Sequence, residues 1–131
     1  MLEQDSLDDL LPLCQERGIS IVAGGVFNSG VLIDPRPGTH YNYEAAAAPV
    51  IERARRIGAV CERHGVPVEA AALQFPLGHP AVACVLTGVR TTAELNANLA
   101  AFEFPIPPEL WLDLKREQLL RQDAPVPEDD R

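Results

Sequence analysis

The sequence predicts an α/β fold built on two short parallel strands. Two apolar runs, Ile19 to Ala23 and Val82 to Leu86, have the length and composition of strands buried on both faces of a parallel sheet. Stretches with apolar residues at helical spacing lie before, between and after these runs. A strand, a helical crossover and a second strand form a βαβ unit, so we expect the two strands to run parallel.

The first helix is expected to begin at Ser6 and to end at Gly18. Ser6 is a candidate N-cap with Asp9 at the third helical position. Apolar residues then recur at helical spacing, at Leu7, Leu10, Leu11 and Cys14. Pro12 lies inside this pattern, so it should kink the helix or delay its start.

A long loop and two helices are expected to connect the strands. Residues 24–43 contain glycines, prolines and aromatics without a period, and long loops in compact domains are usually functional. The first connecting helix should start at Pro49 and stop at Gly65, with an apolar face formed by Val50, Ile51, Ala54, Ile57 and Cys61. The second should start at Pro67, pack through residues 70–73 and end near residues 75–76.

Two more helices and a tail should follow the second strand. One helix is expected from Thr91 to Phe102, with Leu95, Asn98 and Leu99 on one face. Pro105 would prevent it from continuing. Pro107 and Pro108 should open the last helix, whose buried side would carry Leu110, Trp111 and Leu114. Residues 122–131 are charged and proline-rich, which predicts a disordered tail after a folded part at 1–121.

The segment from Val85 to Asn98 has the order of an anion site. An apolar strand runs into Gly88, Arg90 follows, and Thr91 with Glu94 has the spacing of a capping box that opens a helix. Free N–H groups and the positive end of the helix dipole would face a ligand above this turn. An ordinary turn with a capped helix has the same spacing, so both interpretations stay open on the residues alone.

The sequence as a whole resembles the C-terminal part of an aldo-keto reductase. Residues 10–32 are similar to the helix, seventh barrel strand and cofactor loop of that family, residues 70–82 to the approach to its eighth strand, and residues 85–98 to its last strand and helix. The Gly24-Gly25 start of the loop, with residues 27–30, is most similar to the branch of L-fucose, D-threo-aldose 1- and pyridoxal 4-dehydrogenases. The resemblance implies two strands of a (β/α)₈ TIM barrel, which is incomplete as a barrel because a full one needs eight strands and about 250 residues.

The resemblance also implies a binding site for NAD or NADP. The loop residues Gly24, Gly25, Val26, Phe27, Asn28, Ser29, Gly30 and Leu32 would lie along the pyrophosphate and nicotinamide. Gly88, Arg90, Thr91, Glu94 and Asn98 would surround the adenosine. For Asn98, a local bond to the strand above is an almost equal alternative.

Two departures from the family pattern bear on this site. Many relatives stack an aromatic ring on the nicotinamide where this chain has Gly24, and many carry Gln or Arg where it has Glu94. A carboxylate at Glu94 would accept a bond from a ribose 2′-hydroxyl and repel a 2′-phosphate, which favours NAD. Glu94 could instead be fully occupied as a helix cap.

The Asp, Tyr, Lys and His that transfer protons in this family lie in the N-terminal half of its barrel, and none of them maps onto this chain. Tyr41 and Tyr43 fall in the variable loop, and the only lysine is Lys115. We therefore expect the isolated chain to be inactive, as the cofactor-binding portion of an oxidoreductase for an aldose or a pyridoxal-like substrate. Scattered Cys and His residues predict no metal site.

The composition excludes other classes of function. A formal net charge of −8 argues against nucleic acid and anionic membranes as partners, no apolar run is long enough to span a bilayer, and no secretory signal is visible. The three cysteines, Cys14, Cys61 and Cys84, are expected to be small buried residues in a reducing cytoplasm.

Three interpretations remain for a chain of 131 residues with only two barrel strands. It is expected to be a truncated reductase whose missing N-terminal half or second copy covers the open sheet edges. The alternatives are a non-catalytic nucleotide-binding or oligomerising fragment, and a separate small fold that uses similar helices. The coding sequence upstream of Met1 would distinguish them.

Overall fold

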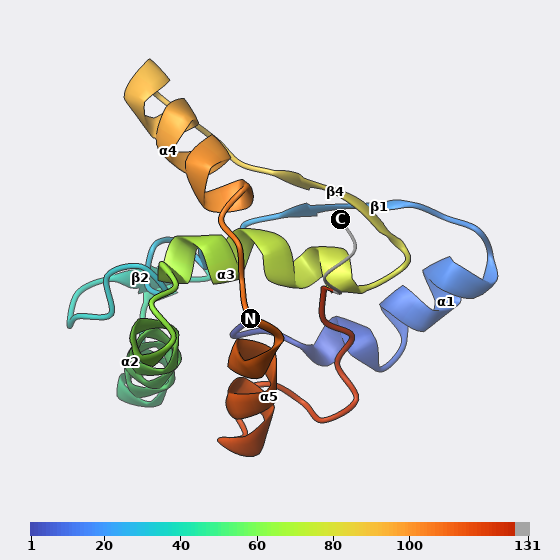
Figure 1. The fold of residues 1–131 in the computed structure, drawn as a ribbon, viewed down its shortest axis with the longest axis horizontal. Coiled ribbons are helices and arrows are strands. Elements are labelled where there is room, and N and C mark those ends of the chain that lie inside the picture. The colour runs from blue at the N-terminus through green and yellow to red at the C-terminus, as the bar shows by residue number, and fades with distance from the viewer. Residues whose placement is uncertain (128–131) are drawn as a thin grey trace.

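The computed structural model describes residues 1–127 of the chain (Figure 1). A 3-10 helix at Asp5–Leu7 leads into α1 (Leu10–Glu16) and β1 (Ile21–Gly24). The connection to the second long strand contains β2 (His40–Tyr41), β3 (Glu44–Ala45), α2 (Ala48–Arg63), α3 (Val68–Gln74) and a 3-10 helix at Phe75–Gly78. β4 (Val82–Leu86), α4 (Thr92–Phe102) and α5 (Pro108–Arg116) complete the fold.

β1 and β4 pair in parallel, as the sequence predicts, and form a two-stranded sheet. Ile21 pairs with Val82 and Gly24 with Leu86, with an irregularity after Ile21. One face of this sheet lies over α3 and the 3-10 helix that follows it (Figure 1). The other face is open, because the side chains of Val22 and Leu86 are 59% and 65% exposed.

The hydrophobic core lies mainly among helices. The expected apolar face of α2 is buried, with Ala54, Ile57 and Val60 completely inaccessible. It packs with α3 and with the buried side of α5, which consists of Leu110, Trp111 and Leu114 as expected. Val31 and Leu32 from the loop after β1 enter the same core. The core therefore anchors that loop at Val31 and Leu32, directly after residues 25–30.

Several helix boundaries follow the local signals in the sequence. α1 begins at Leu10 rather than Ser6, so Pro12 falls in the first turn, where a missing N–H costs nothing. The expected N-cap at Ser6 is wrong, since a separate 3-10 helix occupies residues 5–7. Gly18 and Gly65 end α1 and α2 with φ angles of 64° and 66°, a conformation that glycine adopts without strain.

One expectation about burial is wrong. Cys84 is exposed, whereas Cys14 and Cys61 are buried as expected. α4 contacts the rest of the described chain mainly at its C-terminal end, where Ala101 packs against the core and its carbonyl accepts from the amide of Gln74 at 3.1 Å. The face of the helix with Leu95 and Leu99 is open, since these residues are 43% and 51% exposed. Figure 1 shows α4 projecting away from the rest of the chain at the end of β4.

A buried glutamine joins the beginning of the chain to its end. The amide nitrogen of Gln4 donates to the carbonyl oxygens of Met1 (2.8 Å) and Leu119 (3.2 Å). Its amide oxygen accepts from the backbone N–H of Arg121 at 2.8 Å. The segment that follows continues along the core, with Ala124 buried. The predicted disordered tail falls partly on residues 128–131, which lie outside the described residues.

No helix within residues 1–127 is long and apolar enough to cross a membrane.

We predict that Gln4→Leu lowers the free energy of unfolding by about 1–3 kcal/mol, because it leaves the buried N–H of Arg121 without its acceptor. Gln15→Leu is the matched control, since Gln15 is exposed on α1. Urea unfolding followed by circular dichroism measures both. Equal midpoints for the two variants would show that Gln4 does not hold the two ends together.

Candidate functional site

The loops that follow β1 and β4 leave the sheet at the same edge. Gly24 and Leu86, the last residues of the two strands, are partners in the parallel register. The chain therefore continues from neighbouring points into the loop that starts at Gly25 and the turn that starts at Thr87. In α/β sheets, ligands bind outside the carboxyl ends of parallel strands, which makes this edge the candidate site.

A hollow of about 640 Å³ lies between the two loops. The first loop contributes five of the residues that the sequence singles out, namely Gly25, Val26, Phe27, Ser29 and Gly30. The turn after β4 contributes three more, namely Gly88, Arg90 and Glu94. Residues about 60 positions apart in the sequence are thus brought to one groove by the pairing of β1 with β4.

The remaining candidates lie outside this groove. Leu32 is 1% exposed and belongs to the core, and Thr91 serves as the N-cap of α4. The side-chain nitrogen of Asn98 donates to the hydroxyl of Thr87 at 3.3 Å, which is the local bond that the sequence left as an alternative. Gly24 and Asn28 line a different cavity, on the helical side of the sheet.

The first loop has a tightly turned backbone. Asn28, Ser29 and Gly30 follow one another with φ angles of 50°, 58° and 93°, and Gly25 has a φ of 66°. Two turn bonds hold this path, from the N–H of Asn28 to the carbonyl of Gly25 (2.8 Å) and from the N–H of Gly30 to the carbonyl of Phe27 (3.0 Å). Such conformations are strained for residues other than glycine and concentrate at functional sites.

The glycines of the groove leave space for a ligand. A Cβ atom placed on Gly25, Gly30 or Gly88 would meet no other atom within 4 Å. The space above these three residues is therefore open, and a ligand could approach the main chain closely there. In such an open cradle, backbone amides can approach and bind an anion.

Arg90 and Glu94 form a pair at the start of α4. One carboxylate oxygen of Glu94 accepts from the backbone N–H of Arg90 at 2.7 Å, and the other from its guanidinium at 3.3 Å. The N–H of Arg90 and, to a smaller extent, its guanidinium hold the pKa of Glu94 below its usual value. The hydroxyl of Thr91 accepts from the N–H of Glu94 at 3.1 Å. The helix cap predicted from Thr91 and Glu94 thus forms. The Glu94 carboxylate accepts from the N–H of Arg90, however, and not from the N–H of the N-cap residue Thr91.

The Arg90 guanidinium remains available to an anion. Its side chain is 90% exposed, and only one of its terminal nitrogens contacts Glu94. A guanidinium has five N–H donors, so a phosphate or an adenine face could engage the others.

Four residues of the groove were missed by the sequence analysis: Ile33, Asp34, Leu86 and Thr87. Leu86 and Thr87 could have been found from the sequence. Leu86 ends β4 and Thr87 follows it, at the edge of a parallel sheet where ligands bind. Asp34 carried no signal of its own, since it lies in a loop without periodicity. Its carboxylate pairs with Arg36 at 2.7 Å and adds a second negative charge to the groove.

The tyrosines and the lysine do not form a proton-transfer pair. The hydroxyl of Tyr41 donates to Glu3 at 3.1 Å, and the side chain of Tyr43 is 96% exposed. Lys115 lies at the end of α5 and donates to the carbonyl of Gln122 at 3.1 Å. His64 bonds to Asp113 at 3.0 Å and joins α2 to α5. Within residues 1–127, no group of three or more Cys, His, Asp or Glu residues could hold a metal ion.

A pair of neighbouring parallel strands with helices on one face and a ligand groove at their carboxyl ends is the arrangement of a (β/α) barrel segment. The family model for the Aldo/keto reductase family matches residues 1–116, so this chain belongs to the aldo/keto reductase family. The expected family and the partial barrel fold are both confirmed.

The curated relatives fit the expected branch. The chain is 44% identical over 121 residues to a pyridoxal 4-dehydrogenase of Microbacterium luteolum, covering 92% of this chain and 35% of the relative. It is 38% identical over 122 residues to a D-threo-aldose 1-dehydrogenase of a Pseudomonas species, covering 92% of this chain and 37% of the relative. The chain therefore spans little more than a third of the length of these relatives.

A solved structure gives the same picture. The holo form of an aldo-keto reductase, AKR11C1 from Bacillus halodurans, superimposes with a TM-score of 0.58 at 27% sequence identity. The match covers 95% of this chain and 41% of the solved one.

Proposed function

We propose that the groove binds a nicotinamide dinucleotide and that the chain is the cofactor-binding portion of an oxidoreductase. The observation that carries this proposal is the single groove of about 640 Å³ in which two separate glycine-containing loops meet Arg90. Gly25, Gly30 and Gly88 would let the main chain approach the pyrophosphate, and Arg90 would pair with a phosphate or stack on the adenine. The bound cofactor would accept or supply the hydride.

An alcohol of an aldose or of a pyridoxal-like compound is the substrate that we propose for the complete enzyme. The support is the identity to a pyridoxal 4-dehydrogenase and a D-threo-aldose 1-dehydrogenase. A non-catalytic nucleotide-binding or oligomerising role is the second candidate. The open face of the sheet, where Val22 and Leu86 are 59% and 65% exposed, favours the oligomerising form of this second candidate.

We further propose that NAD is preferred over NADP. Asp34 and Glu94 both line the groove together with Arg90, while Arg36 pairs with Asp34 from outside the lining. A 2′-phosphate would add negative charge beside two carboxylates, whereas a 2′-hydroxyl could donate a hydrogen bond to one of them.

The self-association expected from the open sheet remains a proposal. The exposed face carries Val22 and Leu86, and α4 adds Leu95 and Leu99. We predict that the purified chain is a dimer or a larger species, because apolar strand edges and faces of this kind seldom stay in water. Size-exclusion chromatography with light scattering measures the mass. A monodisperse monomer with a sharp cooperative melt would contradict this prediction.

The chain by itself is predicted to show no dehydrogenase activity with NAD or NADP on L-fucose, D-arabinose or pyridoxal. Neither tyrosine lies with Lys115 in an arrangement for proton transfer, and general acid–base catalysis requires such positioned groups. Absorbance of the reduced cofactor at saturating substrate measures turnover, with a buffer blank as control. Turnover by pure protein would show that a different set of residues is catalytic.

The cofactor site is tested most simply by the two charges at the start of α4. Arg90→Ala should weaken the binding of NAD about ten- to a hundred-fold, because a charge-assisted contact contributes about 1.5–3 kcal/mol. Glu94→Gln should improve binding of NADP relative to NAD by removing a charge near the 2′ position. Arg17→Ala, an exposed residue outside the groove, is the control. Calorimetric titration gives all the dissociation constants.

The outcomes of these two variants are separable. Unchanged NAD affinity in Arg90→Ala would remove the phosphate role and leave Arg90 as a solvated turn residue. An unchanged ratio of NADP to NAD affinity in Glu94→Gln would mean that Glu94 acts only as a cap.

A further inference from the structure

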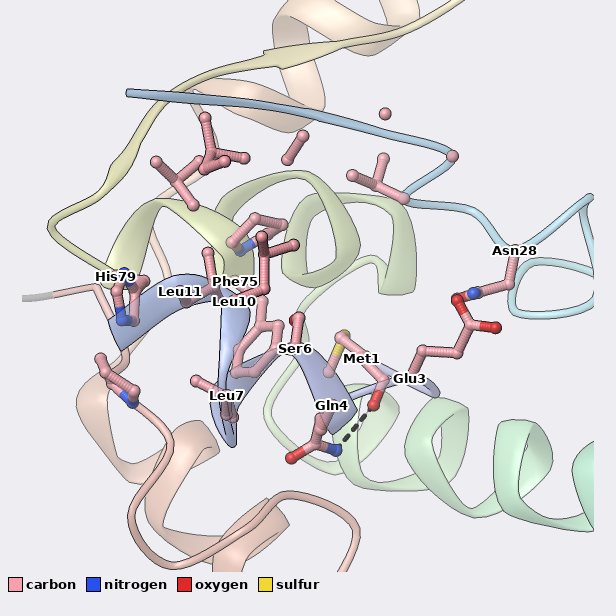
Figure 2. A pocket seen from close by; sticks show the side chains of 18 residues that line it. Met1, Glu3, Gln4, Ser6, Leu7, Leu10, Leu11, Asn28, Phe75 and His79 are labelled. Atoms are coloured by element: carbon pink, nitrogen blue, oxygen red, sulfur yellow. Dashed lines mark hydrogen bonds between the residues drawn. The ribbon is translucent and has the colours of Figure 1, made fainter. Parts of the chain in front are cut away.

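A second cavity, of about 260 Å³, lies on the helical side of the sheet (Figure 2). Its walls come from β1 and β4, from α1 with the 3-10 helix before it, and from the 3-10 helix at Phe75–Gly78. Most of the lining is apolar, including Leu7, Leu11, Ile21, Phe75 and Val82. The cavity shares Gly25 and Val26 with the dinucleotide groove but lies on the other side of this loop.

His79 presents a hydrogen-bond donor to this cavity. Its Nδ1 accepts from the backbone N–H of Ala81 at 3.1 Å, so the proton of the neutral ring is on Nε2. Nε2 has no hydrogen-bond partner within residues 1–127, although the residue is only 7% exposed. Burial lowers the pKa of His79, which keeps the ring uncharged at neutral pH.

Asn28 is a buried polar residue that also lines this cavity. It is 9% exposed, its φ of 50° is unusual, and its side-chain oxygen is enclosed without a hydrogen bond. Figure 2 shows Asn28 and His79 on opposite sides of the cavity, with Leu11 and Phe75 between them in this view. This oxygen is an acceptor and is enclosed, so it would not pair with an acceptor on a ligand, and the open Nε2–H of His79 is the polar group that would select one.

We propose that this cavity is a binding site for an uncharged, single-ring molecule that carries a hydrogen-bond acceptor. The acceptor would take the Nε2–H of His79, and the ring would lie against Phe75 and the apolar residues of the walls. The volume is below the range of about 300–1,000 Å³ that holds drug-sized ligands, which limits the molecule to one ring. A neutral His79 supplies no positive charge that would hold an anion.

The energetics favour such a ligand over an empty space. Apolar walls favour an apolar ring over water, because water finds few hydrogen-bond partners along them. An acceptor opposite His79 adds a hydrogen bond that the protein does not make for itself, typically about 0.5–1.5 kcal/mol. The site should therefore take up apolar rings in general and select those with a correctly placed oxygen.

Two probes of matched size test this selectivity. Acetophenone carries a carbonyl oxygen, and ethylbenzene has a similar shape without one. Each is titrated into the ¹⁵N-labelled full chain while the amide signals of Ala23 and His79, at the cavity, and of Gly88, at the groove, are followed by NMR. Both probes should shift the cavity signals and leave Gly88 unchanged. His79→Phe should lower the affinity for acetophenone relative to that for ethylbenzene by about 2- to 12-fold, because only acetophenone loses a hydrogen bond to residue 79.

A filled cavity gives the second arm of the test. Ala23→Leu adds a larger side chain to the lining and should abolish binding of both probes. Ala83→Leu is the matched control, because Ala83 is exposed on β4 and does not line the cavity. Absence of shifts at the cavity of the wild-type chain overturns the proposal, as does an unchanged affinity ratio in His79→Phe. If Ala23→Leu does not fold, the positions of the wild-type shifts still decide where the probes bind.

Discussion

The parallel pairing of β1 with β4 is the constraint on which the site depends. The two strands are short, and their last residues, Gly24 and Leu86, are partners across the sheet. Because parallel strands end at the same edge, the loop after β1 and the turn after β4 must start side by side. Neither loop forms the groove alone. A shift in register would separate Gly25 and Gly30 from Gly88 and Arg90, and the cradle would be lost.

The packing explains why this pairing persists although only one face of the sheet is covered. The core formed by α2, α3 and α5 lies apart from the open face, and Val31 and Leu32 tie the first loop into it. Residues 25–30 are thus held on both sides, by β1 and by the core, which supports the turned backbone at Asn28 and Ser29. Apolar residues on the open face of the sheet gain no stabilisation from burial. The apolar residues buried among the helices supply most of the hydrophobic stabilisation of the described chain.

Local signals in the sequence predicted the elements well. Pro49, Gly65 and the stripe from Ile51 to Cys61 defined α2, and Thr91 with Glu94 marked the start of α4. The branch of the family followed from the residues around Gly24. The exposure of Cys84 and of α4 could not be predicted. An apolar residue favours burial, but the sequence does not say whether another segment is present to cover it. Asp34 was missed because its place in the groove depends on the path of an aperiodic loop.

Amide hydrogen exchange with and without NAD tests directly whether both loops contact one dinucleotide. Exchange should slow on addition of NAD in residues 25–30 and in residues 87–94 together, with the same dependence on NAD concentration. Protection confined to one loop, or protection in neither, would contradict a shared site at the carboxyl edge of β1 and β4.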